Sequence, residues 1–197
     1  MTGREQIRIN VIGQGWSGKS NLVKHLSDKY GFDVFRPSDV IREYAEAKGI
    51  SISSREDYVR AYSDMTNIDP DAVSGPVINS QSERLIVDGM RVPRDVVKTQ
   101  MKVGMLIVAL DCPVELRFAH MLDSPKGRRL RDGGHITTID QFIADEAIDN
   151  SSTDPDMPNV ITIMKMAELT LDASQPETTV HQQADEYVGR ILAFTGF

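Results

Sequence analysis

The chain has 197 residues, of which 40% are hydrophobic, and a formal net charge of −7 at pH 7; this suits a single globular domain and argues against a broad nucleic-acid-binding surface. Its single cysteine, Cys112, excludes an internal disulfide framework. Because no apolar run approaches the roughly 20 residues that cross a bilayer, and the first residues lack the core of a signal peptide, we expect a cytoplasmic protein with no membrane partner.

The first predicted strand covers residues 7–12, IRINVI, and the chain then reads GQGWSGKS. This stretch fits G-x-x-x-x-G-K-[ST], the phosphate-binding P-loop, which requires a strand before it and a helix after it. Glycines allow backbone N–H groups to surround an anion, and the helix N-terminus adds a positive dipole end. Lys19 can reach the β- and γ-phosphates, and the Ser20 hydroxyl can ligate Mg²⁺.

We therefore predict that ATP and Mg²⁺ bind here. A chance match in a chain of this length is on the order of one in a hundred, and it would correspond to an ordinary turn with an incidental lysine. The predicted nucleotide-binding residues are Gly13, Gln14, Gly15, Trp16, Ser17, Gly18, Lys19, Ser20 and Asn21.

Later elements alternate between helical and strand patterns. A helix is expected after the glycine stretch, an edge strand over 32–36, and helical patches within 50–83. Near-continuous apolar runs predict strands buried on both faces, as in a parallel sheet; these runs are 85–88, 105–111 and 169–172. Helices opened by Pro113 and near the C-terminus complete a doubly wound α/β pattern.

Three further stretches carry a family resemblance. They read SDVIRE at 38–43, DGMR at 88–91 and GRR at 127–129, and a weaker fourth stretch, AELTLDAS, covers 167–174. Together with the P-loop, they resemble the nucleoside monophosphate kinase family, in particular the adenylate-kinase-like nucleotide kinases that include dephospho-CoA kinases. Only the P-loop is a highly specific motif.

The resemblance implies a P-loop NTPase three-layer α/β/α fold with a five-stranded, mainly parallel sheet. It also implies one kinase domain over 1–197, with an acceptor-binding helical insert at about 37–83 and a short lid at about 123–146. The implied reaction is ATP-dependent phosphoryl transfer to a nucleoside or deoxynucleoside monophosphate. The implied partner is therefore a small-molecule nucleotide acceptor rather than nucleic acid, and the protein would be a monomer or homodimer.

The resemblance also implies roles for individual residues. Lys19, Asp88, Arg128 and Arg129 would be catalytic, and Ser20 and Asp88 would hold the metal, Asp88 through water. The acceptor would be bound by Ser38, Asp39, Arg42 and Arg91.

Two positions depart from the family pattern. Ala144 stands where close members have arginine, and His120 lies where an arginine often stacks on the donor base.

Structural interpretations remain open for several of these residues. Asp88 could cap a strand, and Asp111 ends the next strand and competes with Asp88 for the Mg²⁺ role. Arg42 could lie on a solvated helix face beside Glu43 and Glu46. The basic run at 126–131 could simply be exposed.

Two other functions are compatible with the sequence. A kinase for dephospho-CoA or a hydroxyl metabolite would share the P-loop, and in the hydroxyl case an aspartate such as Asp39 could activate the acceptor. A nucleotide-regulated binding protein would need the P-loop but no second phosphate site.

Overall fold

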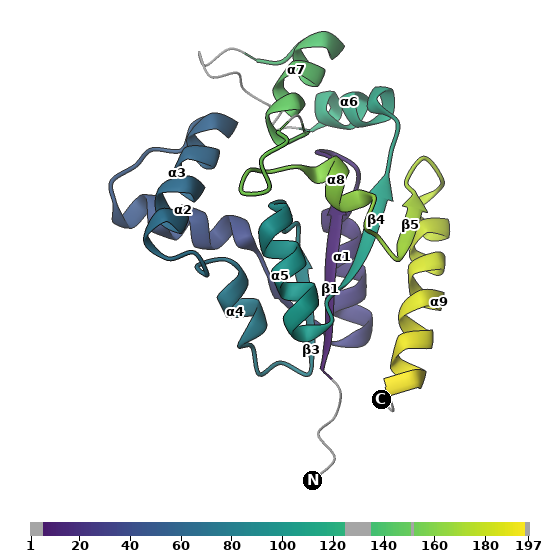
Figure 1. Cartoon of the computed structure of the whole chain (residues 1–197). Coiled ribbons are helices and arrows are strands. Elements are labelled where there is room, and N and C mark those ends of the chain that lie inside the picture. The colour runs from purple at the N-terminus through teal and green to yellow at the C-terminus, as the bar shows by residue number, and fades with distance from the viewer. Residues whose placement is uncertain (1–5, 125–134, 151, 196–197) are drawn as a thin grey trace.

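The computed structural model describes residues 6–124, 135–150 and 152–195 (Figure 1). Within this part of the chain, five strands form one parallel sheet in the order β2-β3-β1-β4-β5. The strands are β1 (Ile7–Gly13), β2 (Asp33–Phe35), β3 (Arg84–Asp88), β4 (Leu106–Asp111) and β5 (Leu169–Asp172). The strands predicted from apolar runs are confirmed, with no end shifted by more than one residue.

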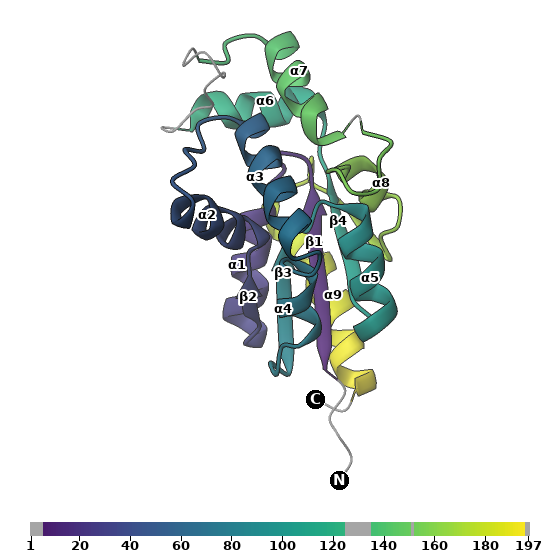
Figure 2. The same ribbon diagram turned by 60° about the vertical axis from the view of Figure 1, so that its left-hand side comes forward.

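Successive side chains along the central strands point to opposite faces, and each face has its own hydrophobic core. Leu85 and Val87 of β3 pack on one face, whereas Ile86 between them packs on the other. Helices cover both faces (Figures 1 and 2), which gives the predicted three-layer α/β/α arrangement.

On one face lie α1 (Lys19–Tyr30) and α9 (Glu177–Thr195), which bury the side chains of Leu22, Leu26 and Val180. The other face is covered by helices between β2 and β4 and by one short helix before β5. These are α2 (Pro37–Ala47), α3 (Arg55–Ile68), α4 (Ser74–Ile78), α5 (Pro93–Val103) and α8 (Val160–Met164).

Two helices lie beyond the carboxyl ends of the strands (Figure 1): α6 (Val114–Asp123) and α7 (Ile139–Asn150). They share a small core of Met121, Ile136 and Phe142, against which the P-loop residue Trp16 packs. Because parallel strands present their carboxyl ends at one edge, the segments after β1, β2 and β3 meet below these helices.

None of the helices in the described part of the chain combines the length and the apolar character that a membrane span requires.

Candidate active site

The P-loop has the backbone geometry of a phosphate cradle. Gly18 adopts φ 89° at the N-terminus of α1, and Trp16 adopts φ 66°, both in the left-handed region. A Cβ at Gly13 would lie 2.7 Å from the Leu110 carbonyl oxygen, so a larger residue does not fit there. Ser17 Oγ is buried and has no hydrogen-bond partner among the described residues. This polar, curled loop fits a bound phosphate chain.

Lys19 supplies a desolvated cation at this loop. Its Nζ donates a hydrogen bond to the Gln14 carbonyl oxygen at 2.7 Å, so its partner there is neutral. The pKa of Lys19 is lowered to about 7, chiefly by burial and also by the nearby Arg91 charge, while Asp88 opposes the shift. A desolvated ammonium whose hydrogen bond goes to a neutral carbonyl favours an incoming anion, which fits the phosphates of a nucleotide.

A cleft of about 890 Å³ opens beside the P-loop. Nearly every described residue predicted for the site lines it, including Ser20, Asp39, Arg42, Asp88 and Arg91. Ser38 and the P-loop from Gly15 to Asn21 complete this set, whereas Gly13 and Gln14 are not among the lining residues. The other two predicted catalytic residues, Arg128 and Arg129, lie outside the described residues.

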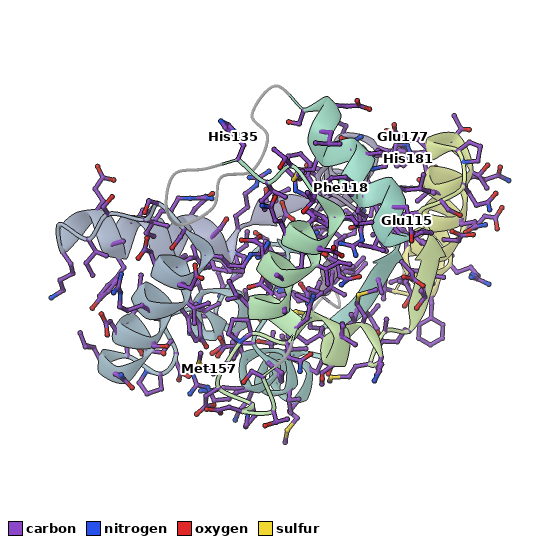
Figure 3. The ribbon with its side chains drawn as sticks, turned by 90° about the horizontal axis from the view of Figure 1, so that it is seen from above. Glu115, Phe118, His135, Met157, Glu177 and His181 are labelled. Carbon is purple, nitrogen blue, oxygen red and sulfur yellow. The ribbon has the colours of Figure 1, made fainter. Side chains whose placement is uncertain are left out.

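The cleft runs between two sides of the molecule. Arg36, Asp39 and Arg42 come from the start of α2 and from the residue before it, while His181 and Glu177 come from α9. Figure 3 shows Glu177 and His181 on α9, on the opposite side of the molecule from α2 and α3. A ligand in the cleft can therefore contact the P-loop and both side walls.

Each arginine on the α2 side has a carboxylate partner. Arg42 Nη1 lies 3.1 Å from Asp39 Oδ1, and both side chains are exposed. Arg36 Nε lies 3.5 Å from Asp88 Oδ2, which is largely buried. Exposed pairs are weak and exchange readily with ligands, so Arg42 and Asp39 remain available to a bound acceptor.

Arg91 is held differently, by a residue that the sequence did not indicate. Its Nη1 lies 2.9 Å from Asp149 Oδ2, and Asp149 also pairs with Arg55 of α3. The sequence feature related to the pairing of Asp149 with Arg91 is the helical spacing of three acidic residues, Asp145, Glu146 and Asp149. Nothing in that spacing identifies the partners, because Arg91 is 58 positions away.

A second residue missed from the sequence is Asn10, in the middle of β1. It is fully buried; its amide donates to the Met90 carbonyl at 3.2 Å, and its oxygen accepts from the Met90 N–H at 3.0 Å. These bonds fix the segment after β3 that carries Asp88 and Arg91. The sequence signal was a polar residue, Asn10, in the middle of the run IRINVI, which is otherwise apolar except for Arg8.

Arg117 supports the P-loop from behind. It is buried, donates to the Cys112 carbonyl at 2.9 Å and to the Gly15 carbonyl at 3.3 Å, and pairs with Glu146. His120, one turn later, contacts the Trp16 carbonyl at 3.1 Å and lines the cleft. His120, at the expected donor-base position, therefore lines the cleft, whereas Arg117 is not among the lining residues. Ala144, the other departure from the family pattern, is exposed.

The fold and this cradle define a P-loop protein of the α/β class. The chain belongs to the AAA domain family, whose profile matches residues 12–140. No curated protein sequence matches the chain.

Solved structures with the same fold include several P-loop kinases. A shikimate kinase from Acinetobacter baumannii in complex with shikimate is 15% identical, with a TM-score of 0.59 and coverage of 96% of this chain and 95% of that one. A shikimate kinase from Bacteroides thetaiotaomicron is 14% identical (TM-score 0.58; coverage 93% and 98%).

A gluconokinase from Sinorhizobium meliloti 1021 is also 14% identical (TM-score 0.55; coverage 98% and 99%). These similarities confirm the predicted P-loop kinase fold.

Proposed function

We propose that the protein transfers the γ-phosphoryl group of ATP to a hydroxyl group of a small metabolite. The observation that carries this proposal is that a carboxylate, Asp39, and the P-loop cation, Lys19, line one cleft. The similarity in fold to a gluconokinase and to shikimate kinases supports a small acceptor. A hydroxyl acceptor requires a base, and the cleft supplies Asp39 in an accessible position.

On the donor side, the P-loop backbone and Lys19 would hold the β- and γ-phosphates in line with the acceptor. The Ser20 hydroxyl is exposed at the loop and fits a Mg²⁺ ligand, and Asp88 lines the same cleft at a position suited to a metal-bound water. When bound, Mg²⁺ neutralises charge on the phosphate oxygens.

On the acceptor side, Asp39 would accept the hydroxyl proton as the hydroxyl oxygen forms its bond to the γ-phosphorus. The bond between the γ-phosphorus and the bridging oxygen breaks, and ADP leaves. Arg42, 3.1 Å from Asp39, would orient that carboxylate. Asp39 has more than half of its side chain exposed, so a substrate hydroxyl can reach it.

A nucleoside monophosphate acceptor is the second candidate, and one observation favours it. Arg36, Arg42 and Arg91 all line the cleft, and guanidinium groups bind phosphate oxygens in pairs. An acceptor phosphate is largely ionised near neutral pH, so Asp39 would have no proton to accept.

Asp39→Asn separates the two candidates. For a hydroxyl acceptor, loss of the base should lower kcat by about 10²–10⁴, while the ATP dissociation constant, measured by the fluorescence of the single tryptophan Trp16, stays unchanged. Glu43→Gln, an exposed carboxylate on the same helix, is the matched control. Full turnover in Asp39→Asn with the best hydroxyl acceptor would refute the proposed base.

A further inference from the structure

Four charged side chains form a cluster at the α2–α3 end of the cleft. Arg55 of α3, Arg91 after β3, and Asp145 and Asp149 of α7 make up this cluster, called here the α7 cluster. Arg91 Nη1 lies 2.9 Å from Asp149 Oδ2, and Arg55 Nε lies 3.6 Å from Asp145 Oδ2. Arg55 also binds the same Oδ2 of Asp149.

Only one member of the α7 cluster is substantially open to the cleft. The side chain of Arg91 is 37% exposed and lines the cleft, whereas that of Asp149 is 6% exposed. Arg55 and Asp145 are also largely buried. The four formal charges cancel, so the cluster presents no excess positive charge to a bound acceptor.

An anionic group at Arg91 would meet the Asp149 carboxylate. A phosphate or carboxylate that bound Arg91 would either lie beside a buried like charge or draw Arg91 away from it. Drawing Arg91 away is unfavourable because the buried Asp149 would lose one of its two charge-assisted hydrogen bonds and keep only the one from Arg55. Arg91 is therefore held more firmly by the buried Asp149 than Arg42 is held by Asp39, because both members of the Arg42–Asp39 pair are exposed.

The neighbouring wall offers uncharged polar recognition instead. Tyr58 lines the cleft and also a small pocket that it shares with Arg91, Asp149 and Tyr62. The phenol of Tyr58 is neutral and able to donate at physiological pH, and burial raises its pKa further, to about 12. A phenol hydroxyl pairs well with the hydroxyl groups of an uncharged polyol or sugar.

We propose that Asp149 is a specificity-determining residue that occupies Arg91 and so reserves this end of the cleft for an uncharged, hydroxyl-bearing part of the acceptor. This inference rests on the proposed function in one respect, namely that the cleft takes a small acceptor opposite the P-loop. It adds the chemical class of that acceptor at the Arg91 subsite.

Phosphate binding without turnover tests the role of Asp149. The P-loop is first saturated with a non-hydrolysable ATP analogue and Mg²⁺, and inorganic phosphate is then titrated against chloride at matched ionic strength, with the unfolding temperature as the readout. In the wild type we expect no phosphate-specific stabilisation that Arg91→Gln removes. In Asp149→Asn, which frees Arg91, we expect phosphate affinity to rise about tenfold or more, as for one charge-assisted hydrogen bond gained.

Asp145→Asn is the matched control, since it makes the same change of charge on the same helix but on the Arg55 side of the cluster. It should resemble the wild type. Equal phosphate stabilisation in all three proteins, or none in Asp149→Asn, would overturn the proposal.

If Asp149→Asn does not fold, the wild type and Arg91→Gln decide the question. Phosphate stabilisation of the wild type that Arg91→Gln abolishes would show that Arg91 is open to anions, which overturns the proposal. No phosphate effect that depends on Arg91 supports it. Because no step of this test needs catalysis, failure of hydroxyl transfer in an activity assay and failure of the Asp149 inference are separate results.

Discussion

At the scale of single residues, Lys19 shows how burial prepares a site for its ligand. The ammonium is desolvated within the P-loop and donates to a backbone carbonyl, and its pKa falls to about 7. A phosphate chain would supply the negative charge that the loop lacks, so ligand binding and lysine protonation are coupled.

Replacing Lys19 by Met should remove most of the stabilisation of the transferred phosphoryl group. A charge-assisted hydrogen bond is worth about 1.5–3 kcal/mol, so kcat/KM should fall by at least about tenfold to a hundredfold for each bond lost. Lys24→Met, an exposed lysine on the same helix, is the control. A folded Lys19→Met protein with wild-type kcat/KM would show that the loop is not the donor site.

The lowered pKa of Lys19 also predicts a pH dependence of ATP binding. Above a pKa of about 7 the free protein loses the proton from Lys19, whereas the phosphate-bound lysine retains it. ATP affinity should therefore fall as pH rises through 7, and binding at pH 8 should take up a proton. Calorimetry in two buffers of different ionisation enthalpy measures this uptake, and it should be absent in Lys19→Met. Equal proton uptake in both proteins would assign it to another group.

At the scale of elements, a buried ion pair joins α6 to α7, and one of its members also binds the P-loop. Arg117 of α6 and Glu146 of α7 are each about 5% exposed or less, and Arg117 also donates to the Gly15 carbonyl. One turn further along α7, Asp149 holds Arg91. The same helix thus braces both the donor loop and the acceptor end of the cleft.

Glu146→Gln should destabilise the fold, because it leaves the Arg117 charge buried without its carboxylate. Removing one partner of a buried pair costs about 3–5 kcal/mol in the free energy of unfolding. In contrast, Arg117→Met combined with Glu146→Leu removes both charges and should recover most of that loss. Urea unfolding of the two variants provides the test, and a Glu146→Gln protein as stable as the wild type would contradict it.

At the scale of the whole molecule, the fold was predictable from the sequence to the extent that it depends on apolar runs and the P-loop. Residues 85–88 and 105–111 are apolar throughout because both faces of their strands are covered, and this pattern is visible without a structure. The partners of Arg91 and Asn10 were not predictable. They depend on contacts between residues 58 and 80 positions apart, which no local pattern encodes.

ATP binding should stabilise the entire domain, since the cleft joins segments from the P-loop, α2, β3 and α9. With free ATP–Mg²⁺ at a hundred times its dissociation constant, the gain is about 2.7 kcal/mol. For a chain of this size, that corresponds to a rise in unfolding temperature of roughly 5–10 °C. Differential scanning fluorimetry measures the shift, and an equal shift in Lys19→Met would show that ATP binds elsewhere.

Identifying the acceptor is the most direct test of the central claim, that the protein transfers phosphate to a hydroxyl group. The measurement is ATP-dependent ADP release with a panel of uncharged polyols and sugars, gluconate, shikimate, dephospho-CoA and nucleoside monophosphates, with Lys19→Met as the blank. The proposed function predicts release that requires a hydroxyl acceptor and falls in Asp39→Asn. Release only with nucleoside monophosphates and unaffected by Asp39→Asn, or slow release that no acceptor accelerates, would contradict it.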